Sequence, residues 1–325
     1  MNAKFKGAPV TDLIKLPIPV IAVFALVLFF ISACQPDKPG QASVPDDYPA
    51  EIKEWQEYRI GVLTDSTGWL RLVDLIWLDE GENSFGSADT RDIQFPQRSI
   101  ASYGGTFIKD GEEVTMKVAD GVEITHNGEP VQDFLLYDGE NRLHVKHGTL
   151  EWYVDRRGDD LGIRIYDMNT PKADNFEGFP RYEVKREWVR EARFIPHAEE
   201  KTIRVVNVLG DEIDRESPGK VEFTINGKLY SLDAFEARSG LFLMFADETN
   251  KTDTYQAGRY MIIDFPDDDN RTVIDFNKAY NPPCAFSKFT TCQLPPPQNR
   301  LDVAIAAGEK RPVGWEGMNV MSVEN

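Results

Sequence analysis

Short segments rich in β-branched and aromatic residues, separated by Gly, Asn and Asp, recur along most of this chain. Such segments are typical of β-strands broken by turns. Asn226-Gly227 lies between two of them and predicts a hairpin, because a type I′ turn requires positive φ at both central residues. This pattern favours a mainly β fold, an antiparallel sandwich or barrel, over a parallel α/β sheet. The predicted strands are 113–118, 122–126, 142–154, 161–166, 202–208, 221–225 and 228–232.

One helix is predicted, over residues 49–60. Ile52 and Trp55 fall on one side at helical spacing, with Pro49 near the start and Gly61 as the end signal. The charged, turn-prone run 155–160 indicates a module boundary, although the same run could be a hairpin loop. We therefore expect two β-rich modules, 48–155 and 156–325.

The N-terminal segment predicts export and lipid attachment. Three lysines precede an uncharged run over 16–33, and Cys34 follows directly. This order is typical of a lipoprotein signal peptide, residues 1–33, with Cys34 as the lipidated first residue. A retained signal anchor is the alternative, because the run approaches the roughly 20 residues of a spanning helix. Gln35, rather than Asp, favours the outer membrane. The expected location is thus the bacterial cell envelope, facing the periplasm.

Residues 34–47 are polar, rich in Pro and poor in apolar side chains. A segment of this composition cannot bury enough surface to fold on its own. The sequence therefore predicts a flexible, semi-extended tether between the lipid and the folded part of the chain.

The charge of the chain limits its partners. It carries 36 basic and 54 acidic residues, a formal net charge of −18 at pH 7. Phosphate backbones attract proteins largely through Lys and Arg, so we expect no nucleic-acid partner. The expected partners are the membrane, through lipid on Cys34, and an unknown small ligand or envelope protein. No cofactor is predicted.

Cys284 and Cys292 remain as a pair once Cys34 carries lipid. An even number of cysteines in an oxidising compartment favours a disulfide. A redox pair and a metal pair are the alternatives. A zinc site would need two further ligands, and no His lies near this pair in the sequence.

Familiar catalytic signatures are missing from the sequence. It contains no G-x-S-x-G, no G-x-x-x-x-G-K-[ST] and no H-E-x-x-H. The acidic run 264–270 does not have the spacing of an EF-hand and is interpreted as a solvated turn. No metal site is predicted.

Residues 275–310 form the densest group of Pro, Cys, Asn, Tyr and charged residues. Such a rigid segment could present a ligand site, or it could be a cap over an open sheet edge. The candidate binding residues in and near it are Arg259, Asp275, Asn277, Tyr280, Asn281, Asn299, Arg300 and Glu309.

Several motifs in this region resemble those of the DUF1684 family, an uncharacterised bacterial domain family. They are the segments 280–286, 291–292, 294–297 and 299–301, with earlier matches that include 68–70, 75–78, 162–164 and 257–260. The resemblance implies kinship over about 54–310 and no mechanism. Residues 85–95 and 126–128 also faintly resemble a forkhead-associated domain, but Ser87 stands where such domains carry an Arg.

Three functions are compatible with these features. The first is a ligand- or partner-binding module with its site near Arg259 and residues 275–300. The second is an envelope enzyme in which Asp275 or Glu309 is the acid/base, Tyr280 donates a proton, and Arg259 or Arg300 binds an anionic group. The third is a purely structural envelope lipoprotein.

Overall fold

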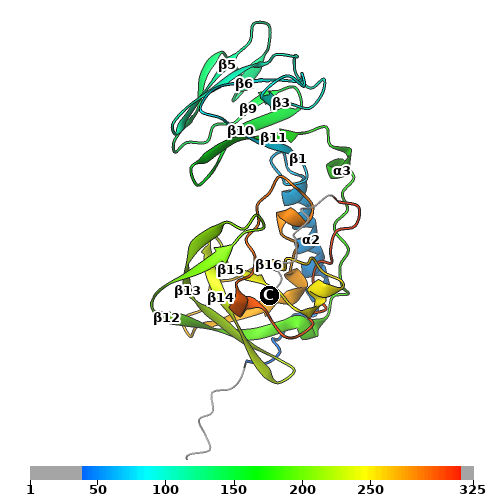
Figure 1. The fold of residues 1–325 in the computed structure, drawn as a ribbon. Helices are drawn as coiled ribbons and strands as arrows, with labels where there is room; N and C mark the ends of the chain where they lie inside the picture. Colours follow the sequence, from blue (N-terminus) through cyan, green and yellow to red (C-terminus); the bar gives the residue numbers. More distant parts are fainter. Residues whose placement is uncertain (1–38, 316–325) are drawn as a thin grey trace, which may run out of the picture. The chain divides into compact units, whose positions relative to one another are not determined.

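Three β-sheets make up most of the folded chain (Figure 1). The computed structural model describes residues 39–315. The first sheet has the order β1-β11-β10-β9-β6-β7 and the second β3-β2-β4-β5-β8. Their strands are β1 (Leu72–Trp77), β2 (Gly81–Gly86), β3 (Ile93–Gln94), β4 (Gly105–Asp110), β5 (Glu113–Val118), β6 (Ile124–His126), β7 (Glu129–Val131), β8 (Asp133–Asp138), β9 (Val145–His147), β10 (Leu150–Arg157) and β11 (Asp160–Asp167).

The first two sheets share one hydrophobic core and form a β-sandwich. Phe85 and Phe107 of the second sheet stack at 4.4 Å between ring centroids, and Trp152 of the first sheet is fully buried in the same cluster. Strand β5 alternates buried and exposed residues, as a strand with one face on the core should. Apart from the short β2–β3 pair, all strand pairs in the sandwich are antiparallel.

The third sheet is antiparallel, with the order β16-β15-β14-β13-β12-β17. It curves around a separate core that contains Phe223, Phe245 and Phe276, together with Leu301 and Ile305 from the chain after the last strand. The strands are β12 (Val189–Val206), β13 (Glu212–Ile225), β14 (Lys228–Ala237), β15 (Gly240–Phe245), β16 (Arg259–Ile263) and β17 (Arg271–Asp275).

Helical segments are few among the described residues. They are α2 (Tyr48–Thr64), α3 (Pro171–Asp174) and the short 3₁₀ helices η1 (Arg186–Trp188), η2 (Glu248–Lys251), η3 (Phe276–Lys278), η4 (Pro283–Ala285) and η5 (Pro297–Asn299). Within residues 39–315, no helix combines the length and the apolar character that crossing a bilayer requires.

The mainly β prediction is confirmed, as are most of its details. Strand β5 has the predicted bounds, and Asn226 and Gly227 have φ values of 50° and 77°, as a type I′ turn requires. The predicted strand 142–154 is instead two strands, β9 and β10, which turn at Gly148. The predicted helix is present but continues past Gly61, because the next turn buries Leu63.

The boundary predicted at residue 155 falls inside a hairpin. Strands β10 and β11 pair continuously from Leu150 and Asp167 to Arg157 and Asp160, so the run 155–160 is the turn-proximal part of one sheet. The alternative interpretation as a hairpin loop describes this segment, and the chain leaves the sandwich only after Asp167.

The predicted tether is wrong over its second half. Ala42 donates a backbone hydrogen bond to Val189, Glu191 donates one to Gly40, and Gln41 forms a β-bridge with Arg190. Ala42 is buried in a small cluster with Val189 and α2. Backbone pairing with β12 thus orders a segment whose composition offers few apolar side chains. Residues 1–38, including the predicted signal peptide and Cys34, lie outside the described residues.

Candidate functional site

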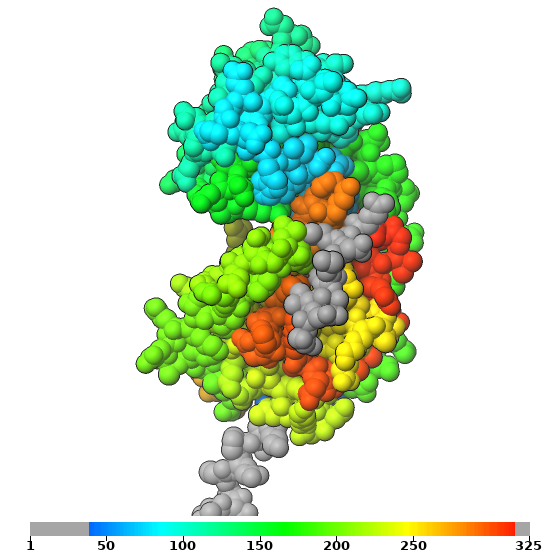
Figure 2. Space-filling model, in the orientation of Figure 1, coloured from blue at the N-terminus to red at the C-terminus, as the bar shows by residue number. Residues whose placement is uncertain are grey.

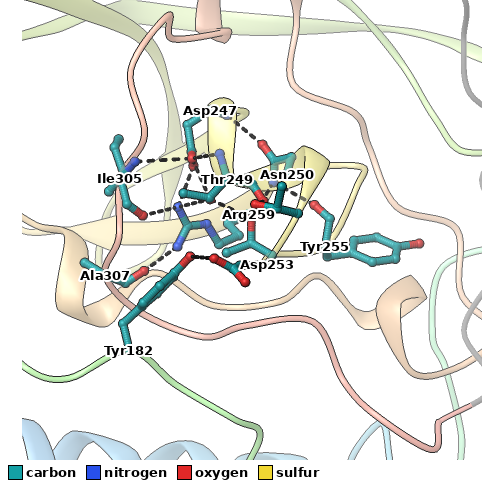
Figure 3. A network of polar contacts seen from close by, with 11 residues as sticks. Tyr182, Asp247, Thr249, Asn250, Asp253, Tyr255, Arg259, Ile305 and Ala307 are labelled. Carbon is teal, nitrogen blue, oxygen red and sulfur yellow. Dashed lines mark hydrogen bonds and ion pairs between the residues drawn. The ribbon is translucent and has the colours of Figure 1, made fainter.

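Arg259, the first predicted binding residue, is enclosed in the third sheet. Its side chain has no exposed surface, and its Nη2 lies 2.5 Å from Oδ2 of Asp247, which is equally enclosed. The guanidinium also donates to the carbonyl oxygens of Ile305, at 3.0 Å, and Ala307 (Figure 3). Asp247 in turn caps η2 by accepting from the backbone and hydroxyl of Thr249. Arg259 therefore holds three segments together and cannot reach an anionic ligand.

Asp275 and Asn277 also belong to a buried network. The Tyr48 hydroxyl lies 2.8 Å from both carboxylate oxygens of Asp275, and Asn277 Nδ2 donates to that hydroxyl at 2.8 Å. Burial raises the pKa of Asp275, and burial together with the Asp275 charge raises the pKa of Tyr48. These contacts attach α2 to the sheet and leave Asp275 poorly placed to exchange protons with a substrate.

The side chain of Asn299 links the backbones of two strands, whereas Arg300 is exposed. The Asn299 amide accepts from the backbone N–H of Asp233 at 2.7 Å and donates to the carbonyls of Asp233 and Met244, each at 2.9 Å. It is fully buried and links β14 to β15. Arg300 is exposed, whereas Asn299, Arg259 and Asp275 are buried.

Glu309, Asn281 and Tyr280 do come together, with two arginines that sequence reasoning missed. Glu309 accepts from Arg59 Nε at 2.9 Å, from Arg181 Nη1 at 3.4 Å and from the Asn281 backbone at 2.7 Å. The Arg59 guanidinium lies 4.3 Å from the centroid of the Tyr280 ring. Burial raises the pKa of Tyr280 to about 12 and lowers the pKa of Arg181.

The cavity beside this cluster is small. Arg59, Arg181, Glu309 and Phe179 contribute to its wall, and its volume is about 50 Å³. That is room for roughly one or two waters rather than an organic ligand. Arg59 comes from α2 and Arg181 from the segment after α3, so neither lies near residues 275–310 in the sequence.

The predicted disulfide is not formed in the structure. Cys284 and Cys292 are both free and buried, and they lie side by side, with the Cys284 backbone N–H donating to Cys292 Sγ at 2.9 Å. The surrounding segment is held by backbone bonds of η4 and by packing against Tyr255 and Phe286. Although the two cysteines are buried, other atoms of the surrounding chain, coloured orange in Figure 2, lie on the surface.

A second missed feature is a pocket of about 380 Å³ whose charged lining residues are mostly arginines. We call it the arginine pocket. Its charged lining residues are four arginines and one carboxylate. Apolar and small polar side chains complete it. The lining residues are Trp69, Asp155, Arg156, Arg157, Arg164, Arg215, Phe242, Tyr260, Pro283, Thr290, Thr291, Cys292 and Gln293.

Asp155 pairs with more than one guanidinium in this pocket. Arg164 Nη2 lies 2.8 Å from Asp155 Oδ2, and Arg157 Nε lies 3.4 Å from the same oxygen. Arg142, outside the lining, approaches the other oxygen at 3.3 Å. Burial, followed by the nearby charge of Arg164, lowers the pKa of Arg157. Within the lining, Asp155 thus pairs with two arginines, while Arg156 pairs with Glu112 outside the lining at 2.6 Å.

Arg215 approaches the pocket from β13. Its Nη1 donates to Gln293 Oε1 at 2.8 Å, and its guanidinium lies 4.9 Å from the centroid of the Phe235 ring. Burial lowers the pKa of Arg215, which has no ion pair within the described residues. The sequence signal for this pocket is weak: the run 155–160 indicates a turn and the segment 162–164 carries family resemblance, and neither pattern predicts binding.

One further arrangement places Ser217, His197 and Asp233 close together, beside a broad groove of about 670 Å³. Ser217 Oγ lies 3.3 Å, and Asp233 Oδ1 lies 3.5 Å, from the same ring nitrogen, His197 Nε2. A hydrolase relay needs the serine and the carboxylate on different ring nitrogens. The buried Ser217 hydroxyl is also 2.8 Å from the Ala234 carbonyl. The arrangement therefore stabilises the bulge between β12 and β13 and does not form a catalytic triad.

Comparison with known proteins finds, over part of this chain, a match to a family whose activity is not assigned. Residues 174–310 match the model of DUF1684, described as a protein of unknown function. A solution structure of an uncharacterised protein from Haloarcula marismortui is 30% identical over 43% of this chain and 80% of its own, with a TM-score of 0.36. A search of curated proteins finds no match.

Proposed function

We propose that this chain, whose residues 174–310 match DUF1684, is a binding protein for a small organic anion, with the arginine pocket as its site. One observation carries the proposal. In a chain with a formal net charge of −18, the pocket lining contains four arginines and one carboxylate, and within the described residues only Arg156 has a further carboxylate partner, Glu112, outside the lining. Arg164 is buried and the other three arginines are half-buried, and positive charge removed from water is costly unless an anion offsets it.

The size and chemistry of the pocket support an organic ligand. Its volume of about 380 Å³ lies within the range of small-molecule sites, roughly 300–1,000 Å³. Trp69, Phe242 and Tyr260 offer apolar surface beside the guanidinium groups, and Thr290 and Thr291 add hydroxyl groups. Arginine forks match carboxylate and phosphate geometry. The favoured ligand thus carries a carboxylate or phosphate next to an apolar part.

The lining favours binding over catalysis. Asp155 is engaged by guanidinium groups, and the Tyr260 hydroxyl donates to the Gln293 carbonyl at 2.6 Å. Burial raises the pKa of Tyr260 well above its ordinary value. Neither group is therefore free to act as a general base, which the enzyme hypothesis would require.

Titration calorimetry with benzoate and inorganic phosphate tests this proposal. Arg157→Gln and Arg215→Gln should each weaken the binding of benzoate by about tenfold or more, because a hydrogen bond to a charged group contributes about 1.5–3 kcal/mol. Arg204→Gln is the matched control: it removes one positive charge from an exposed arginine that pairs with Asp214 outside the pocket. Affinity should also fall as salt is added.

Two results would contradict the proposal. One is the absence of saturable binding of either anion to the folded wild-type chain. The other is an equal loss of affinity in all three variants, which would indicate a general charge effect rather than a site.

We propose further that the protein is anchored in the cell envelope through lipid on Cys34. The order of basic residues, the uncharged run and Cys34 supports this. Replacing Cys34 by Ser should abolish incorporation of labelled palmitate and move the chain from the detergent phase to the aqueous phase. Cys284→Ser is the control and should keep both properties. Equal labelling of the wild type and the Cys34→Ser variant would refute the anchor.

A further inference from the structure

The free thiols lie at the wall of the arginine pocket, and they differ in their access to it. Cys292 is a lining residue, although only 4% of its surface is exposed, whereas Cys284 is fully buried and is not part of the lining. The Cys284 backbone N–H lies 2.9 Å from Cys292 Sγ, so the two cysteines are in contact. A reagent that enters the pocket would therefore meet Cys292 before Cys284.

The charge around Cys292 favours one class of reagent. Arg157, Arg164 and Arg215 line the same pocket, and the Gln293 side chain that follows Cys292 accepts from Arg215 at 2.8 Å. Positive charge nearby attracts anions. Because Cys292 is nearly enclosed, a small molecule can reach it through the pocket and a folded protein cannot.

We propose that Cys284 and Cys292 are a redox pair that exchanges with small anionic disulfides admitted through the arginine pocket. The choice of disulfide rests on the proposed anion binding, whereas the presence of a reactive pair rests on the contact between the two cysteines and on the place of Cys292 in the pocket lining.

The exchange has two steps. The Cys292 thiolate attacks one sulfur of the incoming disulfide, forms a mixed disulfide and releases the first half as a thiolate. Cys284 then loses its proton and attacks the Cys292 sulfur, which closes the bond between the two cysteines and releases the second half. The protein pair loses two electrons and two protons, and the incoming disulfide gains them as two thiols. Burial raises the pKa of Cys284, in keeping with its role as the second, resolving thiol.

The test compares two disulfides of similar size and opposite charge, 3,3′-dithiodipropionate and cystamine. The full chain carrying Cys34→Ser is used, because it leaves only the pair as reactive thiols. Intact mass after acid quenching reports the mixed and the closed disulfide. We expect dithiodipropionate to react about tenfold faster or more, as charge-lined clefts change association rates. Arg157→Gln should reduce this ratio, and Arg204→Gln should leave it unchanged.

Single cysteine variants establish the order of attack. With dithiodipropionate, Cys284→Ala should accumulate the mixed disulfide on Cys292, whereas Cys292→Ala should react much more slowly. Thermal melts identify any variant that fails to fold, and Cys→Ser versions provide a second set. A mixed disulfide that forms on Cys284 while Cys292→Ala reacts at the wild-type rate would overturn the proposed order.

The outcomes separate this inference from the proposed function. If benzoate binds but neither disulfide reacts with the folded chain, the redox pair is refuted and anion binding stands. If both disulfides react at the same rate and Arg157→Gln changes neither, the charge-selective route is refuted. If benzoate does not bind but dithiodipropionate still reacts faster, the redox inference stands and the proposed function falls.

Discussion

Replacing Asp247 by Ala should lower the free energy of unfolding by about 3–5 kcal/mol, the usual cost of removing one partner from a buried ion pair. The variant leaves the fully enclosed guanidinium of Arg259 without its carboxylate. It also removes the acceptor for the Thr249 backbone and hydroxyl, at 2.8 and 2.6 Å, and so removes the cap of η2. Urea unfolding measures the change.

Asp253→Ala is the control for this prediction. Asp253 lies in the same loop region, but it is exposed and accepts from the Tyr182 hydroxyl at 2.9 Å. Its replacement should cost less than about 1 kcal/mol. The double variant Asp247→Leu, Arg259→Met should recover part of the loss, since an apolar pair can replace a buried ion pair. Equal effects of Asp247→Ala and Asp253→Ala would mean that the ion pair contributes little.

Glu309→Ala should be the second strongly destabilising change, by about 3–5 kcal/mol. Glu309 is almost fully buried. Its carboxylate accepts hydrogen bonds from Arg59, from Arg181, and from the backbone and side-chain amide nitrogens of Asn281. Its removal leaves two partly buried guanidinium groups without this counter-charge. It also weakens one of the links between α2 and the segment 277–281, where Arg59 and Arg181 keep their bonds to backbone carbonyls.

A control variant and a hydrogen-exchange measurement test the role of Glu309. Glu57→Ala, in the exposed helical pair with Lys53, should change stability by less than about 0.5 kcal/mol. Hydrogen exchange of α2 amides should rise in Glu309→Ala and stay unchanged in Glu57→Ala. If Glu309→Ala keeps wild-type stability but alters benzoate binding, this cluster belongs to a ligand site rather than to the scaffold.

The elements that the sequence predicted well are those set by neighbouring residues. Asn226-Gly227 determines its own turn, and the alternation in 113–118 specifies a half-buried strand. The misplaced features depend on distant residues. Helix α2 continues past Gly61 because Leu63 is buried in the core, and residues 40–42 are ordered because β12 provides backbone hydrogen-bond partners.

The candidate site was harder to predict, and the reason is burial. Arg259, Asp275, Asn277 and Asn299 are polar residues at turns and strand ends, where a ligand site and an internal network have the same local sequence. Only the tertiary structure shows that their partners are Asp247, Tyr48 and main-chain atoms. The arginine pocket draws on segments near residues 69, 155–164, 215, 242–260 and 283–293, which no local pattern could join.

The bridge between Gln41 and Arg190 also affects how copies of this protein behave toward one another. Strand β13 pairs with β12 only from Ala192 onward, because its hairpin turns back at Asn226. Residues 40–42 continue that pairing along Val189 and Glu191, where backbone groups would otherwise be open. Unpaired strand backbone is a template for pairing with a second chain. A chain shortened past residue 42 would expose this template. We therefore expect it to lose solubility while its sheet remains folded.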